Sequence, residues 1–227
     1  MAKVFLSLQI KDRPEFDMMA SAWTAMRTTD HQVMVYCIQN EALLTVARND
    51  CMMAFWNSGA DYYMSWDADM ICGNVTRGNN IFDMLIAHDK PFVGGLYTYS
   101  APSRRRCTSK LIDFKDAPPR DAGLCRAEWL AGGSWCIHRD VIGSMIAAYP
   151  ELKYTVGGHA KGETGTYGFF IPYLIPRDDG GQYFLTEDYA FCNRWTSIGG
   201  EIWADPMIDW LHVGKYRYQL YPLPVGE

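Results

Sequence analysis

The segment DYYMSWDADM spans residues 61–70, a hydrophobic and aromatic run that leads into two aspartates, Asp67 and Asp69. Its first six residues favour a β-strand. Upstream, hydrophobic runs at residues 4–10 and 33–38 predict two more strands, with helices expected over residues 14–28 and 41–58 between them. Strand–helix–strand–helix–strand at this spacing predicts parallel pairing and a Rossmann-like half of an α/β fold.

The ends of the two expected helices carry recognisable signals. Pro14 suits the first turn of a helix, and the acids Glu15 and Asp17 suit the positive end of the helix dipole. Asn40 is the expected N-cap of the second helix, which is apolar almost all round and is closed by Gly59. An apolar surface of that extent predicts a helix packed on several sides.

The chain after residue 70 is less regular, and its elements are expected as follows. We expect helices over residues 81–88, 139–149 and 186–198, strands over residues 91–99, 134–138 and 202–205, a short strand near residues 110–114 within a polar loop, a glycine-rich loop over residues 157–168, and an irregular tail from residue 210. No repeat and no linker separates two units. The sequence therefore predicts a single domain over residues 1–227.

Composition narrows the functional class. The 227 residues are 48% hydrophobic and 21% charged, which is typical of a globular protein. The net charge of −5 argues against a nucleic-acid binder, because such proteins neutralise phosphates with an excess of Lys and Arg. Aromatic residues make up 14%, a richness that suits either a carbohydrate or base pocket or simply an aromatic core.

Cysteine usage and hydropathy bear on the compartment. The 7 cysteines are odd in number and include no C-x-x-C pair, which argues against a disulfide framework and a zinc cluster. The N-terminal apolar run is too short for a signal peptide, and no stretch reaches the length of a transmembrane helix. We therefore expect a cytoplasmic protein, in a bacterial cell or a virus-infected host.

Asp67 and Asp69 carry the strongest chemical signal. They follow an expected strand of a parallel sheet, where ligands bind in open α/β folds. Carboxylates at positions i and i+2 of an extended segment point the same way, so both can face one hard cation such as Mg²⁺ or Mn²⁺. The alternative interpretation is a solvated acidic turn.

Five segments, in order, resemble the nucleotide-sugar glycosyltransferases of the GT-A fold, in particular small viral and bacterial members of the family-2 type. The segment at residues 61–69 resembles their D-x-D motif. The other four are ARND at residues 47–50, GGSWC at 132–136, LTEDY at 185–189 and WLHVG at 210–214. The resemblance covers residues 3–217 and implies a GT-A-like mixed sheet whose Rossmann-like, nucleotide-binding half is flanked by helices.

The resemblance also implies roles for individual residues. The metal site, for Mn²⁺ or Mg²⁺, would be formed by Asp67, Asp69 and His212. Asp69 and His212 would bind the ion directly, and Asp67 would contact the ribose of the sugar donor or a metal-bound water. Residues 1–100 would form the half that binds the sugar donor, and residues 101–227 the acceptor half with a C-terminal lid. Binding of the sugar donor is assigned to Gln9, Arg48, Asn49, Asp67, Ala68 and Lys215.

By the same resemblance, Asp188 is the general base that takes a proton from the acceptor hydroxyl, and Glu187 supports acceptor binding. Gly133 and Trp135 are assigned to the acceptor side. A helix N-terminus stabilises a charged carboxylate, so a base placed there would accept its proton late in the transition state. The alternative is that both acids only complement the helix dipole.

Arg48 and Asn49 have an alternative interpretation as well. In an otherwise apolar helix a charge needs a partner, so Arg48 would equally fit an internal ion pair with Asp50 or Asp67.

The sequence as a whole predicts a metal-dependent glycosyltransferase that moves a sugar from a UDP- or GDP-type donor to a glycan, glycoconjugate or protein acceptor, inverting with an aspartate base. One alternative is a sugar nucleotidyltransferase, although residues 9–14 lack the glycine-rich loop which that class carries after its first strand. The other is a non-catalytic sugar- or nucleotide-binding domain of the same fold.

Overall fold

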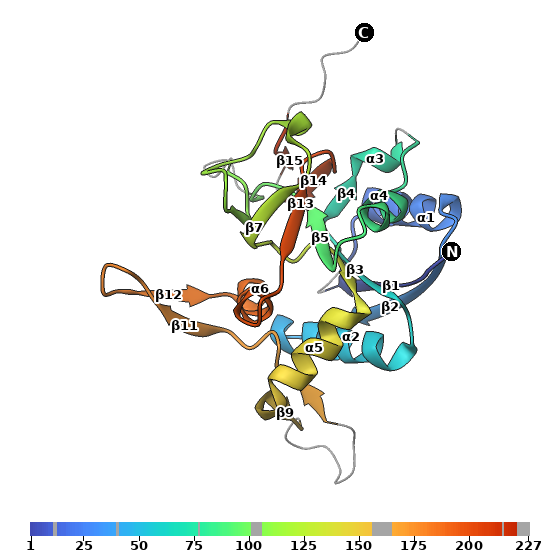
Figure 1. Cartoon of the computed structure of the whole chain (residues 1–227). Coiled ribbons are helices and arrows are strands. Elements are labelled where there is room, and N and C mark those ends of the chain that lie inside the picture. The colour runs from blue at the N-terminus through green and yellow to red at the C-terminus, as the bar shows by residue number, and fades with distance from the viewer. Residues whose placement is uncertain are drawn as a thin grey trace.

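The computed structural model describes residues 1–10, 13–39, 41–76, 78–100, 106–155, 165–214 and 216–221. An eight-stranded sheet forms its centre (Figure 1). In spatial order the strands are β2 (Gln32–Gln39), β1 (Lys3–Ile10), β3 (Tyr62–Asp67), β8 (Ser134–His138), β5 (Phe92–Gly95), β13 (Ile202–Asp205), β7 (Cys125–Trp129) and β6 (Lys110–Leu111).

The sheet is mixed but largely parallel. Strand β1 pairs in parallel with both β2 and β3, which is the pairing expected of a Rossmann-like half. Strands β8 and β7 run against the other six. The α/β class with a mixed sheet flanked by helices, predicted from the sequence, is confirmed.

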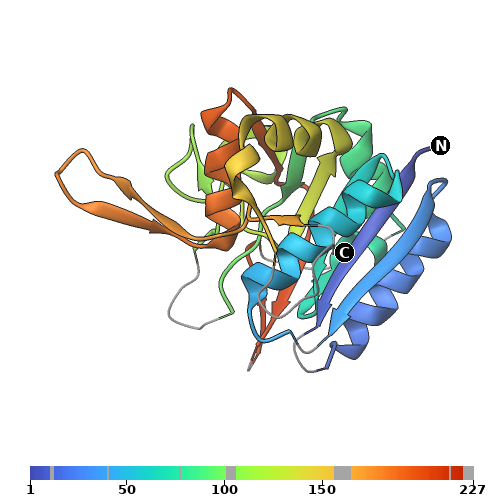
Figure 2. The same cartoon turned by 90° about the horizontal axis from the view of Figure 1, so that it is seen from below.

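Helices cover both faces of this sheet (Figures 1 and 2). One face is packed by α1 (Phe16–Thr28), α3 (Gly73–Thr76) and α4 (Ile81–Ala87), and the other by α2 (Leu44–Ser58), α5 (Arg139–Ala148) and α6 (Glu187–Ser197). Two short 3-10 helices, η1 (Arg120–Ala122) and η2 (Pro150–Leu152), lie in connections. Each face therefore has its own hydrophobic core, and the sheet lies between the two.

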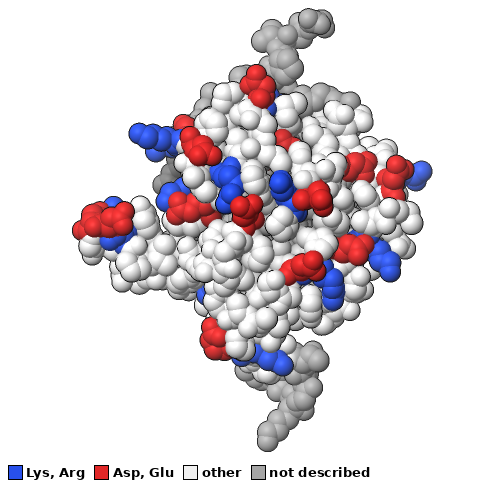
Figure 3. Space-filling model, in the orientation of Figure 1, with Lys and Arg blue, Asp and Glu red and all other residues white. Residues whose placement is uncertain are grey.

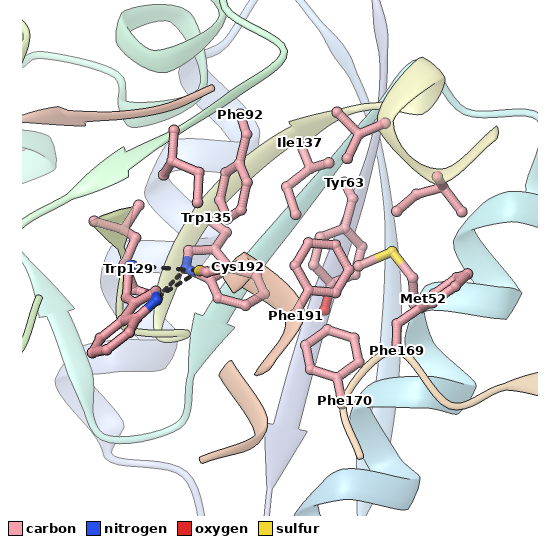
Figure 4. Close-up of a cluster of buried hydrophobic side chains, with 14 of the residues drawn as sticks. Met52, Tyr63, Phe92, Trp129, Trp135, Ile137, Phe169, Phe170, Phe191 and Cys192 are labelled. Atoms are coloured by element: carbon pink, nitrogen blue, oxygen red, sulfur yellow. Dashed lines mark hydrogen bonds between the residues drawn. The ribbon is translucent and has the colours of Figure 1, made fainter. Parts of the chain in front are cut away.

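The core on the α2–α5–α6 face is rich in aromatic rings (Figure 4). The Trp135 ring stacks on Phe170 with centroids 5.8 Å apart, and it meets Phe92 edge-on at 5.1 Å. Phe191 of α6 stacks on Phe170 at 4.8 Å. Offset and edge-on ring pairs of this kind add stability beyond their buried area, so much of the aromatic richness is explained by this core.

Most elements of the first two-thirds agree with the sequence prediction, and the differences are at their ends. Helix α2 begins at Leu44, three residues later than expected, and Gly59 closes it in the left-handed conformation at φ 73°. The expected N-cap Asn40 lies outside the described residues. The strand expected over residues 91–99 ends at Gly95.

The prediction of an irregular tail from residue 210 is wrong. Strands β14 (Trp210–Val213) and β15 (Arg217–Gln219) form a three-stranded antiparallel sheet with β4 (Met70–Cys72). The pairing of β14 with β4 joins segments about 140 residues apart in the chain, so no local pattern near residue 210 predicts these strands.

Further short strands were not predicted. Strands β11 (Tyr173–Pro176) and β12 (Gln182–Leu185) form a hairpin that projects from the body of the molecule, as Figure 2 shows, and β12 leads directly into α6. Strands β9 (Lys153–Tyr154) and β10 (Thr166–Tyr167) flank most of the expected glycine-rich loop, of which residues 157–164 lie outside the described part. In the described part of the chain, no helix has the length and hydropathy needed to cross a membrane.

Candidate active site

The two aspartates of the D-x-D segment lie where β3 ends and turns into β4. Asp67 is the last residue of β3, and β4 starts at Met70. Strand β14 pairs antiparallel with β4, and the register places His212 opposite Met70. The amide of Val213 also donates to the carbonyl of Asp69 at 2.7 Å. This pairing brings the late histidine beside the D-x-D segment.

Tryptophans fix this junction between the two sheets. The indole N–H of Trp66 donates to the carbonyl of Met70 at 2.7 Å, and that of Trp210 donates to the Ser134 hydroxyl at 2.6 Å. The two indoles meet edge-on with centroids 5.1 Å apart. Because both rings are buried and satisfied, they hold the turn at residues 67–70 in place.

His212 and Asp69, two of the residues predicted to bind a metal, lie in direct contact. The His212 Nε2 lies 3.2 Å from Asp69 Oδ2, while its Nδ1 lies 2.8 Å from the carbonyl oxygen of Thr98. A carbonyl can only accept, so Nδ1 carries the proton and Nε2 faces Asp69. Burial lowers the pKa of His212, but the hydrogen bonds to Asp69 and Thr98 outweigh it, and the pKa is raised overall.

The donor set suits a hard divalent cation completed by a substrate. Asp69 keeps 48% of its side chain exposed, so an ion can reach it. A histidine whose second nitrogen is hydrogen-bonded to a backbone carbonyl is the usual form of a metal-ligating imidazole. Among the described residues, no three His, Cys, Asp or Glu side chains form a group that could hold an ion. The pair alone fits Mg²⁺ or Mn²⁺, which commonly takes one or two protein ligands and the phosphates of a substrate.

Asp67, predicted as a further ligand of this site, is turned toward Arg48. Both of its carboxylate oxygens lie 3.5 Å from Arg48 Nη2. Burial raises the pKa of Asp67, Arg48 opposes that rise, and the nearby charge of Asp69 adds to it. Direct contact within the predicted metal trio is therefore limited to Asp69 and His212.

Arg48 is the buried cation at the centre of the site. Its Nη1 donates to the carbonyl of Gly132 at 3.1 Å, and its Nε lies 3.7 Å from Glu187 Oε1. Burial acts to lower the pKa of Arg48, yet the carboxylates of Asp67, Glu187 and Asp188 raise it overall. The ion pair with Asp67, considered as an alternative from sequence, is present. The same guanidinium also joins the D-x-D segment to the Glu187–Asp188 segment.

Gly132 and Gly133 are required by close approach. A Cβ on Gly132 would lie 2.0 Å from Arg48 Nη1, and one on Gly133 would lie 2.9 Å from both Asp67 Oδ2 and the Tyr97 hydroxyl. The amide of Gly133 donates to that hydroxyl at 2.8 Å. The glycines let the turn that precedes β8 pack directly against the charged cluster.

Glu187 and Asp188 form the first turn of α6, as predicted, and Thr186 occupies the N-cap position. Instead of capping the backbone, the Thr186 hydroxyl donates to Asp188 Oδ1 at 2.5 Å. Asp188 Oδ2 accepts from the amide of Gly132 at 3.2 Å. Burial and the neighbouring Asp188 raise the pKa of Glu187, while Arg48 lowers it. Asp188 therefore joins the start of α6 to the segment at Gly132.

A cavity of about 260 Å³ lies at the carboxyl ends of β1 and β2, beside the start of α2. It is lined by Gln9, Ile10, Ile38, Glu41, Ala42, Leu44 and Ala47. Gln9 pairs with Asp67 in the register of β1 and β3, so the cavity adjoins the charged cluster. The carbonyl of Ala68 accepts from the amide of Glu15 at 3.1 Å, which ties the turn between β3 and β4 to the segment before α1. Gln9 therefore lines the cavity, and Ala68 lies between Asp67 and Asp69 in this turn.

Two predicted site residues are engaged elsewhere. Asn49 is buried, and its amide side chain bonds the Tyr154 hydroxyl at 3.2 Å and the Phe170 backbone at 3.0 Å. Trp135 is buried in the aromatic core, with its ring faces covered, so it cannot stack on an acceptor sugar. Both side chains therefore belong to the packed interior next to the site. Lys215 lies outside the described residues.

Sequence reasoning missed Tyr97, Thr98 and Ser65. Tyr97 orients Gly133, Thr98 orients His212, and the Ser65 hydroxyl donates to the carbonyl of Gly132 at 2.6 Å. Thr98 acts through its backbone, which no side-chain motif can reveal. The other two follow from tertiary contacts between segments far apart in the chain.

Comparison with known proteins gives a likeness of fold. No family model matches the chain, and no curated protein matches it. Among solved structures, A197 from STIV aligns with 94% of this chain and 86% of its own at 11% identity and a TM-score of 0.53, which shows a shared fold and nothing finer. GalNAc-T7, solved with UDP, GalNAc and Mn²⁺, aligns with 98% of this chain at 12% identity and a TM-score of 0.43. This chain covers 45% of GalNAc-T7, and the likeness is too slight to support an inference about function.

Proposed function

We propose that this protein is a metal-dependent glycosyltransferase that moves a sugar from a nucleoside-diphosphate sugar to an acceptor hydroxyl. The observation that carries the proposal is the pair formed by Asp69 and His212. The imidazole is oriented by a backbone carbonyl, and the pair lies beside a cluster in which Arg48 joins two acidic segments. A diphosphate leaving group needs this combination of a cation and fixed positive charge.

The Mn²⁺ or Mg²⁺ ion would be held by Asp69 and His212, and when bound it supplies electrophilic stabilisation of the departing diphosphate. The carbonyl of Thr98 engages Nδ1 of His212 and so leaves Nε2 as the nitrogen that would bind the ion. Arg48 contacts Asp67 at 3.5 Å and would hold its carboxylate for the sugar donor while Asp69 and His212 hold the ion. This division explains why only two side chains meet where the sequence predicted three.

The nucleoside of the sugar donor would occupy the cavity at the carboxyl ends of β1 and β2. In open α/β sheets the crevice at the carboxyl ends of the strands is the usual ligand site. Ile38, Leu44 and Ala47 offer an apolar wall for a flat base, and Glu41 offers a carboxylate for its polar edge or for the ribose. The diphosphate would then extend from the cavity toward Asp69.

Asp188 is assigned the role of general base in an inverting transfer. Its two oxygens accept from Thr186, Tyr189 and Gly132, at 2.5, 2.8 and 3.2 Å. These three hydrogen bonds fix the direction of the Asp188 carboxylate. Such a base accepts a proton late, once the acceptor hydroxyl has been acidified by bond formation. Glu187, held by Arg48, would orient the acceptor.

The test is the release of nucleoside diphosphate from UDP- and GDP-sugars in the presence of Mn²⁺, with small glycans as acceptors. Replacing the base with Asp188→Asn should lower turnover by about 10²–10⁴-fold and leave binding of UDP or GDP with Mn²⁺ intact. Asp69→Asn should lower both. Asp178→Asn, on the exposed hairpin tip, is the matched control and should change neither. Turnover that persists in excess chelator, or that survives Asp188→Asn, would reject the assignment.

A further inference from the structure

The two edges of the eight-stranded sheet differ. The β6 edge is only two residues long, begins with Lys110 and has an irregular register at Lys110 and Leu111. Short length, a lysine and a register irregularity are all features that keep an edge strand from pairing with another chain. The β2 edge has none of them. It spans eight residues, QVMVYCIQ, without a charge or a proline.

Strand β2 is also unusually exposed for a hydrophobic strand. Its pattern over residues 32–39 is exposed or half-buried throughout, with Val35 at 49%. Its inner edge pairs with β1, and no other described strand pairs with β2. A long, uncharged, hydrophobic edge of this kind is a template for strand addition.

Helix α1 adds an apolar flank above this edge. One side of α1, with Met18, Ala22 and Ala25, is buried on the sheet. A second side lines a cavity of about 460 Å³ with β4 and β14, toward the middle of the molecule. The remaining side carries Phe16, Met19 and Trp23, of which Phe16 is 82% and Trp23 59% exposed.

The register of the sheet connects the helix flank to the strand. Val35 pairs with Leu6, and Leu6 belongs to the core that packs against α1, so Val35 points to the α1 face. Figure 2 shows β2 at the rim of the sheet with α1 beside it. The outer side of α1 and the α1 face of β2 therefore form one apolar surface, made by Phe16, Met19, Trp23 and Val35, which we term the β2 surface.

We propose that a second copy of this chain binds the β2 surface, with the two β2 strands antiparallel about a two-fold axis perpendicular to the sheet. Such an axis pairs residues that point to the same face, so Val35 or Tyr36 lies opposite itself at the centre. Both α1 helices then lie on one side of the joined sheet, and their exposed flanks meet above the seam.

Self-pairing fits this edge better than pairing with an unrelated chain would. In a symmetric antiparallel pair each residue meets a residue of the same short segment, so any charge in it would face a like charge. Residues 32–39 carry no charge, and hydrophobic residues fill positions 33–38. A two-fold contact also closes on itself and leaves no free β2 edge for further growth.

The test is the mass of the protein in solution, by sedimentation velocity and light scattering between about 1 and 100 µM, the range of a moderately stable dimer. A reducing buffer excludes a disulfide through the exposed Cys37. We expect about twice the 25.8 kDa of one chain. A single-chain mass over the whole range would overturn the proposal and would leave the β2 edge to a different partner.

Variants locate the interface. Val35→Lys brings a charge to the centre of the seam and should give the single-chain mass. Trp23→Ser removes a large aromatic from both halves of the contact and should weaken the dimer roughly thousandfold, because central tryptophans dominate such interfaces and the two-fold counts each twice. The matched control is Phe184→Lys, on the projecting hairpin at 64% exposure, which should remain dimeric.

Hydrogen exchange checks the seam itself and does not depend on any variant folding. In the wild-type dimer, alternate amides of residues 32–39 that face away from β1 should exchange more slowly at high than at low protein concentration. A dimer whose β2 amides exchange equally fast at both concentrations, or a Val35→Lys variant that folds and stays dimeric, would refute the β2 seam. Loss of the dimer would leave the proposed transfer chemistry untested, so the two proposals fail separately.

Discussion

Replacing Arg48 with methionine would remove the buried cation that joins the two acidic segments. Arg48 is only 3% exposed, and its guanidinium contacts Asp67, Glu187 and the carbonyl of Gly132. Methionine matches its length and hydrophobic stem but leaves two carboxylates without their partner. Breaking a buried ion pair from one side costs about 3–5 kcal/mol. That is a large part of the roughly 5–15 kcal/mol by which a domain is stable.

The loss should depend on pH through Glu187. Burial already raises the pKa of Glu187 above its ordinary value, and Arg48 is the charged group that opposes the rise, together with a backbone hydrogen bond. Without Arg48 the folded state holds the Glu187 proton more tightly than the unfolded state, so the stability of the variant falls as pH rises through that raised pKa. The difference from wild type should therefore be larger at pH 8 than at about pH 5, just above the ordinary glutamate value.

The assay is equilibrium unfolding in urea at both pH values, with chelator present so that no bound ion contributes. Arg126→Met is the matched control, because Arg126 and Glu201 are closer, at 2.7 Å, but their side chains are 36% and 48% exposed. An exposed pair contributes about 0–1 kcal/mol. If Arg48→Met costs no more than Arg126→Met, or the same amount at both pH values, the account of Arg48 as a buried bridge is wrong.

Three further substitutions test the fold and the cavity. Gly94→Ala would place a Cβ 2.0 Å from the backbone carbonyl oxygen of Ser134, so thermal unfolding should show a loss of about 1–3 kcal/mol or more. Gly143→Ala, inside α5 with its nearest contact at 3.3 Å, should instead change stability by no more than about 1 kcal/mol in either direction. Ala42→Trp should fill the cavity at the ends of β1 and β2, and so weaken UDP or GDP binding at least about tenfold in calorimetry without lowering the melting temperature. Unchanged nucleotide affinity in Ala42→Trp would move the nucleoside site elsewhere.

The first strands and helices could be predicted from sequence because their signals are local. The runs at residues 4–10, 33–38 and 61–66 each carry their own hydrophobic pattern, and the helices between them have recognisable ends. The signal for the first turn of α6 is equally local, because a threonine at the N-cap position followed by two acids indicates the start of a helix. The class of the fold followed from the order of these elements alone.

The site could be predicted only in part because its contacts are long-range. His212 reaches Asp69 through the pairing of β14 with β4, and the sequence WLHV gives no strong strand signal by itself. Arg48 contacts both Asp67 and Glu187, which lie more than a hundred residues apart in the chain. The sequence suggested the contact between Arg48 and Asp67 but not the contact between Arg48 and Glu187.

The position of Trp135 could not be predicted from sequence for a different reason. A tryptophan beside a glycine pair fits an acceptor platform and a core position equally well in sequence. Packing against Phe170 and Phe191 decides for the core.

The most direct test of the central claim is calorimetric titration of UDP and GDP with and without Mn²⁺, into wild type and His212→Ala. Because Asp69 and His212 are proposed to hold the ion that binds the diphosphate, one of the nucleotides should bind with Mn²⁺ and lose affinity when Mn²⁺ is withheld. His212→Ala should weaken the Mn²⁺-dependent binding at least about tenfold. Equal affinity with and without Mn²⁺, or equal affinity in His212→Ala, would contradict the assignment of this pair as the metal centre.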